Sequence, residues 1–291
     1  MTKHTLSNFE EALTELKSSV SKMGGLAEKL CQDGLSAFIS SNVDMIKNCN
    51  EQDKIIDEAE RSINQQTFRL LALQAPMAID LRMIITSLQI ASCLERCGDY
   101  GRNLARRSDL GLSEASPSLS SGMKRLGEAA ILSLHNSLNA HATGNVELAK
   151  QICLGDTEID KIYLSIFSKL IKEIRDVPEE RITQVSQMFL SAKNIERIGD
   201  QATNIAELII FAETGEVLED SRIKIDESSK TTNIHGKRLD DELHWIKTDK
   251  TKAIELIKEV NKETNDYLKK KKQLQETLVK EYKSRIIEDY D

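Results

Sequence analysis

Proline and aromatic residues are scarce in this 291-residue chain, which contains three prolines, six phenylalanines, five tyrosines and one tryptophan. With so little proline, helices have few forced breaks, and 40% of the residues are hydrophobic. This composition favours a globular, mostly helical protein whose core consists of leucine, isoleucine, alanine, valine and methionine. The length is sufficient for one large domain or two small ones.

Paired cysteines, a positive charge excess and long apolar runs are also missing. The five cysteines form no CxxC pair, which favours small buried residues in a reducing cytosol over disulfides or a zinc site. A formal net charge of −7 argues against a nucleic-acid binder. The N-terminus has no signal-peptide core, and Pro76, Asp80 and Arg82 interrupt the most apolar region, 70–94. We therefore expect a cytoplasmic protein, peripheral to the membrane at most.

The chain contains an internal duplication. Residues 42–57 (NVDMIKNCNEQDKIID) match residues 145–160 (NVELAKQICLGDTEID) at an offset of 103, and residues 95–103 match residues 196–204 at an offset of 101. The gaps between them fall near a connection between helices, where insertions are tolerated. The sequence therefore predicts a tandem repeat of one supersecondary unit.

Each repeat has the apolar spacing of three helices. Asn42 and Asn145 are expected to cap the second helix of their repeats, and Pro76 and Pro178 to lie near the start of the third. The second helix of the first repeat is expected to end near Leu73. The fold class predicted is all-α, with two three-helix bundles over residues 1–110 and 118–222 and a charged helical C-terminal extension over residues 223–291.

The C-terminal segment 223–291 has no counterpart in the repeat and contains 16 Lys and Arg and 15 Asp and Glu residues. Apolar or small residues recur every seven positions within it, which predicts a long exposed helix or a weak coiled coil. The run Lys269–Lys272 is interpreted as a solvated helix face rather than a lipid contact. The residues in this heptad spacing are Ile246, Ala253, Val260, Tyr267 and Leu274.

Each repeat carries two pairs of acids with a helix's spacing. In LERCGD (94–99) and IERIGD (195–200) the two acids are four residues apart, so they share one helical face. The preceding helix of each repeat has a pair with the same spacing. The candidate ligands are Asp53, Asp57, Glu95 and Asp99 in the first repeat, and Asp156, Asp160, Glu196 and Asp200 in the second.

The two pairs of a repeat are equidistant from its proline. Asp57 lies 19 residues before Pro76 and Glu95 lies 19 after it, and the pairs of the second repeat are likewise symmetric about Pro178. An antiparallel hairpin therefore brings four carboxylates to one level, where each like-charge pair costs about 0.2–0.5 kcal/mol. Cations would offset this repulsion, and oxygen ligands without His or Cys suit magnesium, calcium, manganese or iron rather than structural zinc.

Neighbouring residues leave two interpretations open. Gly98 and Gly199 would let another helix or an ion approach closely, and Asn103 and Asn204 could orient the ligands. Alternatively, the acids form an ordinary solvated helix face, whose charge Arg96 and Arg197 partly neutralise.

These residues resemble the PhoU family of phosphate-uptake regulators. The resemblance covers about residues 6–220, and its most specific stretches are QAPMAIDLR (74–82) and the two ERxGD motifs. It implies two three-helix bundles bearing E(D)xxxD motifs that hold multinuclear metal clusters, often iron, on the eight acids named above. The identity of the metal among iron, manganese, magnesium and zinc stays open.

The resemblance also implies a regulatory function. Such proteins are adaptors between the ATPase subunit of the phosphate ABC transporter and a sensor histidine kinase, usually as homodimers or larger oligomers. They restrain phosphate uptake and the starvation response when phosphate is plentiful. The sequence departs from the family in three places. It has the charged extension, and Cys97 stands where an apolar residue, such as Ile198 of the second repeat, is usual. The second repeat has DVPEERITQ (176–184) in place of the QAPxAxDLR pattern.

Three alternatives differ in function. A carboxylate di-metal enzyme is disfavoured because no histidine completes a Glu-x-x-His pair, and no phosphate-binding glycine loop is present. A helical scaffold without metal and an accessory protein of a Pit-type phosphate permease both remain. Whether phosphate binds directly stays open, and only Arg61, Arg69, Arg82 and the Arg102–Arg107 region offer cations for it.

Overall fold

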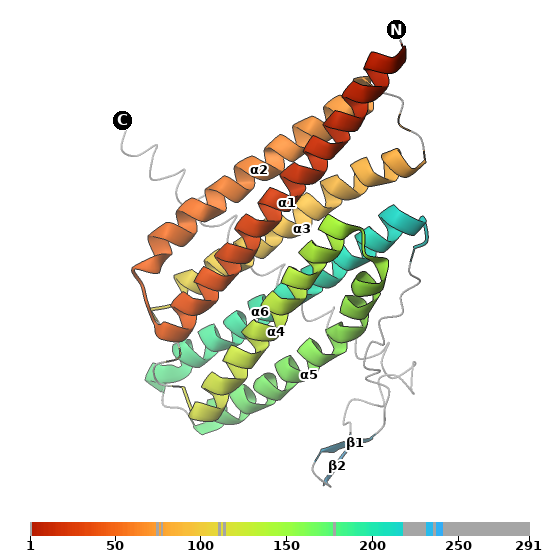
Figure 1. Cartoon of the computed structure of the whole chain (residues 1–291). Helices are drawn as coiled ribbons and strands as arrows, with labels where there is room; N and C mark the ends of the chain where they lie inside the picture. The colour runs from red at the N-terminus through yellow and green to blue at the C-terminus, as the bar shows by residue number, and fades with distance from the viewer. Residues whose placement is uncertain are drawn as a thin grey trace, which may run out of the picture. The chain divides into compact units, whose positions relative to one another are not determined.

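Six helices form the main unit of the computed structural model, which describes residues 2–73, 76, 78–109, 112, 115–176, 179–217, 231–234 and 237–240. This confirms the predicted all-α fold, with three helices from each repeat (Figure 1). The helices are α1 (Thr2–Ser40), α2 (Met45–Leu73), α3 (Ile79–Arg106), α4 (Pro117–Thr143), α5 (Val146–Asp176) and α6 (Glu179–Thr214).

Local sequence explains where these helices begin and end. The side-chain Oδ1 of Asn145 accepts a hydrogen bond from the backbone N–H of Leu148 at 3.0 Å, so Asn145 caps α5 as predicted. The predicted cap at Asn42 is not formed, because α2 begins only at Met45; Oδ1 of Asn42 instead accepts a bond from the N–H of Asp44 in the preceding turn, at 3.0 Å. Helix α2 ends at Leu73, and Pro76 precedes α3; Pro178 lies outside the described residues.

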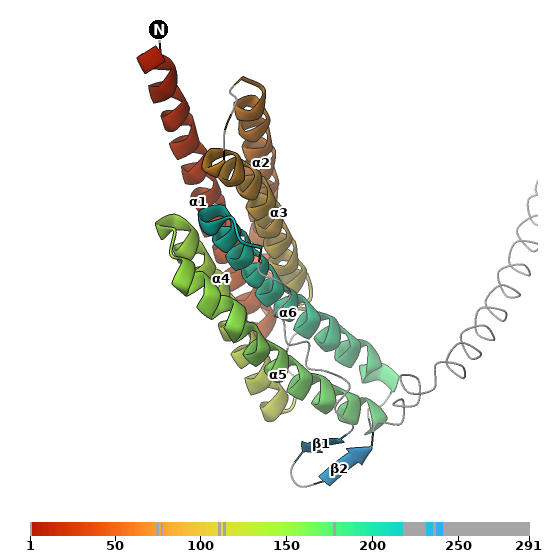
Figure 2. The same cartoon turned by 90° about the vertical axis from the view of Figure 1, so that its right-hand side faces the viewer.

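The two bundles pack on each other through α3 against α6 and α1 against α4. Figure 1 shows the second bundle below the first, and Figure 2, turned by 90°, shows α6 beside α3. The buried residues are mainly leucine, isoleucine, alanine, methionine and cysteine, as the composition predicts. Burial of these side chains supplies the main driving force for folding.

Helices α1 and α3 approach each other closely at a pair of glycines. A Cβ added to Gly34 would overlap the carbonyl oxygen of Gly101, and a Cβ on Gly101 would lie 2.9 Å from the carbonyl oxygen of Leu30. Backbone atoms cannot move aside as a flexible side chain can. Glycine is therefore required for this crossing of the first and third helices.

The C-terminal unit is described only at two short strands, β1 (Thr231–Ile234) and β2 (Lys237–Asp240), which pair antiparallel. The extension predicted to be helical is thus a hairpin at these eight residues, where Thr231, Thr232 and Ile234 are β-branched and favour strands. The heptad spacing from Ile246 to Leu274 lies outside the described residues. No helix in the described part of the chain combines the length and apolarity needed to cross a membrane.

Candidate functional site

The first candidate site lies where α2 and α3 run side by side. Asp53 and Asp57 are on α2, and Glu95 and Asp99 are on α3. A Cβ on Gly98 would lie 3.0 Å from Cδ1 of Ile56, so the glycine makes room for a side chain of the neighbouring helix. The close approach expected at Gly98 is therefore a helix contact, and it brings the two acid pairs together.

Arg102, which the sequence analysis did not select as a site residue, joins acids from both helices. Its Nη1 pairs with Oδ2 of Asp53 on α2, and its Nη2 lies 2.6 Å from Oδ1 of Asp99, one turn earlier on α3. Asp53 is only 5% exposed, so this pair lies largely out of water. A guanidinium stays charged at any physiological pH, which makes Arg102 a permanent internal cation in this site.

The charges of neighbouring acids affect the protonation of Glu95. The pKa of Glu95 is raised to about 7, first by burial and then by the negative charges of Asp99, Glu60, Asp57 and Asp53. Burial also raises the pKa of Asp53, against the lowering effect of its hydrogen bond to Arg102. Glu60 is a further acid of this cluster, one turn beyond Asp57, that the four-residue pairs did not reveal.

The second candidate site repeats the helix contact and has Thr203 at the position that corresponds to Arg102. A Cβ on Gly199 of α6 would lie 2.9 Å from Cδ1 of Ile159 on α5, matching the Gly98–Ile56 contact. The hydroxyl of Thr203 donates a hydrogen bond to Oδ1 of Asp156 at 3.0 Å. Asp160 and Asp200 are half-buried on the same two helices.

Glu196 is the most buried acid of the second site, at 8% exposure. Its Oε1 pairs with Nζ of Lys193 at 2.5 Å, while its Oε2 is buried without a hydrogen-bond partner. Nζ of Lys193 also lies 5.2 Å from the ring centre of Tyr163, and its side chain is 38% exposed. A buried carboxylate oxygen without a partner is costly in a folded protein and commonly marks a place for a water or an ion.

The donor chemistry of the two sites differs in how well it suits a metal ion. As arranged, no group of three or more His, Cys, Asp or Glu side chains among the described residues could hold an ion, so binding requires side-chain movement. In the first site Arg102 already bridges two of the proposed ligands. In the second site Oε2 of Glu196 is buried without a hydrogen-bond partner, and carboxylate oxygens are the type of donor that hard cations prefer.

The arginines of the ERxGD motifs lie at the contact between the repeats rather than on the acids. The guanidinium of Arg197 lies 5.9 Å from the ring centre of Tyr100 on α3. Arg96 and Asn204 line a pocket of about 510 Å³ between α3 and α6. The backbone carbonyl of Asn103 accepts a bond from Arg107 at 2.9 Å. Arg96, Arg197 and Asn204 therefore lie at the junction of the two repeats.

Most of the arginines considered for phosphate make contacts within the protein. The Nε of Arg61 donates to the backbone carbonyl of Asp57, that of Arg106 to Asn50, and that of Arg107 to Gln187. Burial lowers the pKa of Arg107. These separate contacts, together with those of Arg102, do not form a shared cradle for an anion.

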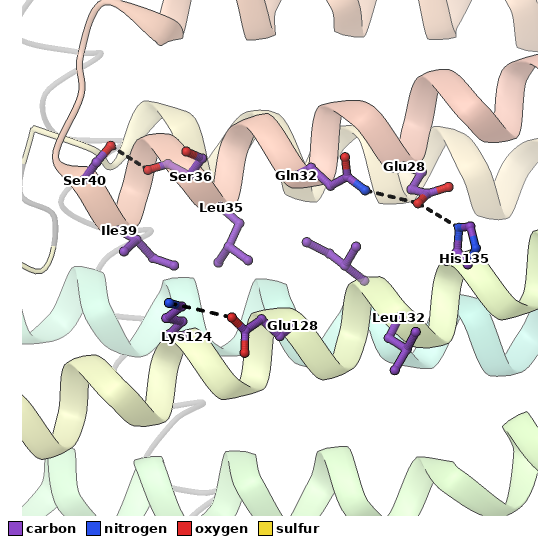
Figure 3. A pocket seen from close by; sticks show the side chains of 11 residues that line it. Glu28, Gln32, Leu35, Ser36, Ile39, Ser40, Lys124, Glu128, Leu132 and His135 are labelled. Carbon is purple, nitrogen blue, oxygen red and sulfur yellow. Dashed lines mark hydrogen bonds and ion pairs between the residues drawn. The ribbon is translucent and has the colours of Figure 1, made fainter.

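A groove of about 570 Å³ runs between α1 and α4 (Figure 3). Apolar side chains including Leu35, Ile39 and Leu132 line it. Glu28 accepts hydrogen bonds from Gln32 at 3.1 Å and from Nδ1 of His135 at 3.0 Å, as Figure 3 shows. Because its polar side chains bind one another, the groove presents no convergent set of groups for chemistry.

Comparisons with known proteins agree with the double bundle. A family model described as the PhoU domain matches residues 20–108 and 123–209, one match in each repeat. The phosphate-specific transport system accessory protein PhoU homolog of Rhizobium meliloti is 39% identical over 78% of this chain and 95% of its own length. The homolog of Caulobacter vibrioides is 37% identical, with 78% and 98% coverage.

Solved structures extend the similarity to three dimensions. The crystal structure of PhoU from Pseudomonas aeruginosa matches with a TM-score of 0.68 and 31% identity, covering 72% of this chain and 100% of that chain. The phosphate transport system regulatory protein PhoU from Streptococcus pneumoniae matches with a TM-score of 0.67 and 26% identity, with 72% and 99% coverage. The resemblance inferred from the QAPMAIDLR and ERxGD stretches is confirmed.

Proposed function

This chain belongs to the PhoU family, and on that premise we propose that it is a cytoplasmic accessory protein of phosphate transport that restrains phosphate uptake and the starvation response. Its role is that of an adaptor, without catalysis, between the ATPase subunit of a phosphate ABC transporter and a sensor histidine kinase. The observation that carries this proposal is the match of both bundles to relatives named as accessory proteins of the phosphate-specific transport system.

Exposed apolar side chains at the ends of the hairpins support an adaptor. Phe68 and Ile79, on either side of the α2–α3 connection, are 61% and 59% exposed, and Leu71, Leu81 and Ile85 are also exposed there. In the second repeat, Ile171 and Ile182 are exposed on either side of the α5–α6 connection. Large apolar residues gathered at the surface are typical of protein contacts, so we assign the partner proteins or a second copy of the chain to these ends.

We further propose that the carboxylates of the E(D)xxxD motifs bind metal ions, iron, manganese, magnesium or zinc. An ion would offset the repulsion among the clustered acids, which adds to the effect of burial in raising the pKa of Glu95. Replacing Asp99 and Asp200 by Asn removes one ligand from each repeat and should lower the metal content while helicity stays unchanged. The matched control replaces the exposed acids Glu51 and Glu158 of α2 and α5 by Gln.

The regulatory role is tested in a strain of the source organism that lacks this protein. The expected result is raised phosphate uptake and a starvation response that stays active in phosphate-rich medium, both reversed by the wild-type chain. An unchanged uptake rate and an unchanged response would contradict the proposal. If the change in phosphate uptake depends on a Pit-type permease and not on the ABC transporter, that permease is the partner.

A further inference from the structure

A pocket of about 340 Å³ lies between the first part of α1 and the last part of α2, at the end of the first bundle that carries Phe68 and Ile79. Figure 1 shows these two helix ends beside each other. The pocket is lined by the apolar residues Phe9, Ala12 and Leu70 and by the polar residues Asn8, Glu15, Gln66 and Arg69. Apolar walls with a few polar groups are typical of places where a partner protein inserts an anchoring side chain.

The residues that form one wall of this pocket belong to the first repeat alone. At the offset of 103, Pro117 at the start of α4 corresponds to Thr14, so residues 2–13 of α1 have no counterpart in α4. Phe9 and Ala12 lie in this additional part of α1 and pack against the core from its edge. The pocket is therefore a feature added to the duplicated fold, which indicates a task specific to the first repeat.

Arg69 brings a positive charge without a counter-ion to the pocket. Its side chain is exposed, and it forms no ion pair or hydrogen bond with another described residue, Glu15 of the same pocket included. In contrast, Arg61 and Arg82 donate to backbone carbonyls of their own chain. A guanidinium binds a carboxylate through two parallel hydrogen bonds. The pocket thus offers an apolar wall beside a cation that fits a carboxylate.

We propose that the pocket receives a large apolar side chain of the transporter's ATPase subunit, and that Arg69 binds an acidic residue next to it. This inference rests on the proposed adaptor function and adds a second contact to the exposed apolar surface at Phe68. Phe68 and Arg69 are consecutive residues of α2, so their side chains point about 100° apart around the helix. A partner that covers this end of α2 meets both.

Glu15 provides a way to determine the charge of the occupant. It lines the α1 side of the pocket, and Arg69 lines the α2 side. The negative charge of Glu15 repels a carboxylate that enters the pocket, whereas it would attract a basic side chain. Neutralising Glu15 should therefore strengthen the binding of an acidic segment and weaken the binding of a basic one.

The test measures the affinity of the purified full chain for the ATPase subunit of the phosphate ABC transporter from the same organism. Arg69→Glu should raise the Kd about tenfold or more, because it replaces an attraction by a repulsion. Arg69→Lys should raise it less, since lysine keeps the charge but loses the paired hydrogen bonds. Glu15→Gln should lower the Kd. The Kd of wild type should rise with salt, and Arg69→Ala should reduce this dependence.

Matched variants separate the pocket from general effects of charge and size. Ala12→Trp fills the pocket and should weaken binding, while Thr14→Trp places the same side chain at an exposed position of α1 outside the pocket and should not. Lys47→Glu makes a charge reversal at an exposed lysine near the start of α2 and should leave the Kd nearly unchanged. Circular dichroism and the melting temperature establish that each variant is folded.

The outcomes distinguish this inference from the proposed function. Equal affinity of wild type, Arg69→Glu and Ala12→Trp, all folded, overturns the inference and leaves the adaptor role in place. Weaker binding by Glu15→Gln overturns the acidic occupant. Absence of binding by wild type overturns the inference together with the adaptor role at this transporter. Weaker binding by Arg69→Glu and Ala12→Trp, with tighter binding by Glu15→Gln, supports the inference.

Discussion

Arg82, near the start of α3, donates a hydrogen bond from its Nε to the backbone carbonyl of Ala212 in the last turn of α6, at 3.2 Å. The contact joins the first repeat to the end of the second, where the helix dipole favours a positive charge. Gly215 follows with φ +78°, and a Cβ there would lie 3.4 Å from the guanidinium carbon of Arg82. The arginine of QAPMAIDLR thus caps the final helix of the other repeat.

Replacing Arg82 by Met should lower the free energy of unfolding by about 1–2 kcal/mol, because the carbonyl of Ala212 loses a charged partner while the aliphatic stem is kept. Urea denaturation measures the change, and hydrogen exchange should show faster exchange in the last turn of α6. Arg106→Met, which changes an exposed arginine on α3, is the control. Equal stability of the two variants would contradict the assigned cap.

Gly34→Ala should destabilise the protein by about 3 kcal/mol or more, because its Cβ would overlap the backbone of Gly101. Gly25→Ala, in the same helix, should instead stabilise it by about 0.5–1 kcal/mol, since a Cβ at Gly25 has no atom within 4 Å. Thermal unfolding of both variants compares them directly. A Gly34→Ala chain as stable as Gly25→Ala would show that α1 and α3 do not cross at this point.

The burial of His141 leads us to expect a loss of stability in mild acid. Its pKa is lowered to about 4 by burial and by the positive charge of Lys17 on α1, and Glu213 of α6 lines the same pocket. The unfolded chain binds the proton near pH 6.5, so stability falls as the pH drops below 6.5 towards 4. Between pH 7 and pH 5 this group should cost about 2 kcal/mol.

The measurement compares urea denaturation at pH 7 and pH 5 for wild type and His141→Gln. The variant lacks the titrating group, so its loss of stability between the two pH values should be smaller by that amount. An identical loss in both proteins would show that His141 binds its proton equally well in the folded and unfolded chains.

The exposed hairpin ends predict where partner binding can be weakened without loss of the fold. Phe68→Ser together with Ile79→Ser should reduce binding to the partner of this chain and leave the melting temperature nearly unchanged, because both side chains are exposed. Val43→Ser, an exposed apolar residue outside that hairpin end, is the matched control. If wild type, the double variant and Val43→Ser bind the partner equally well, the contact lies elsewhere.

Much of this architecture could be predicted from the sequence because the duplication repeats every helix signal. The cap at Asn145, the end of α2 at Leu73 and the approach of the helices at Gly98 follow from local spacing and are present in the structure. Counting residues from Pro76 predicted that Asp53 and Asp99 lie at one level, and Arg102 contacts both of these acids.

The contacts of Arg102 and Arg82 could not be predicted in the same way. Arg102 reaches across to α2, and Arg82 reaches α6 of the other repeat, so each depends on side-chain rotamers and on how the bundles pack. A signal for the first was nevertheless present. In the aligned repeats, GDYGRN has an arginine where GDQATN has a threonine. The difference marks a position where the two sites do not share one chemistry.

The most direct test of the central claim is the binding of the purified chain to the ATPase subunit of the phosphate ABC transporter from the same organism. The account predicts saturable binding of the metal-loaded chain, weakened by the Phe68→Ser and Ile79→Ser substitutions. Absence of binding, with and without phosphate and with and without bound metal, would contradict an adaptor role at this transporter.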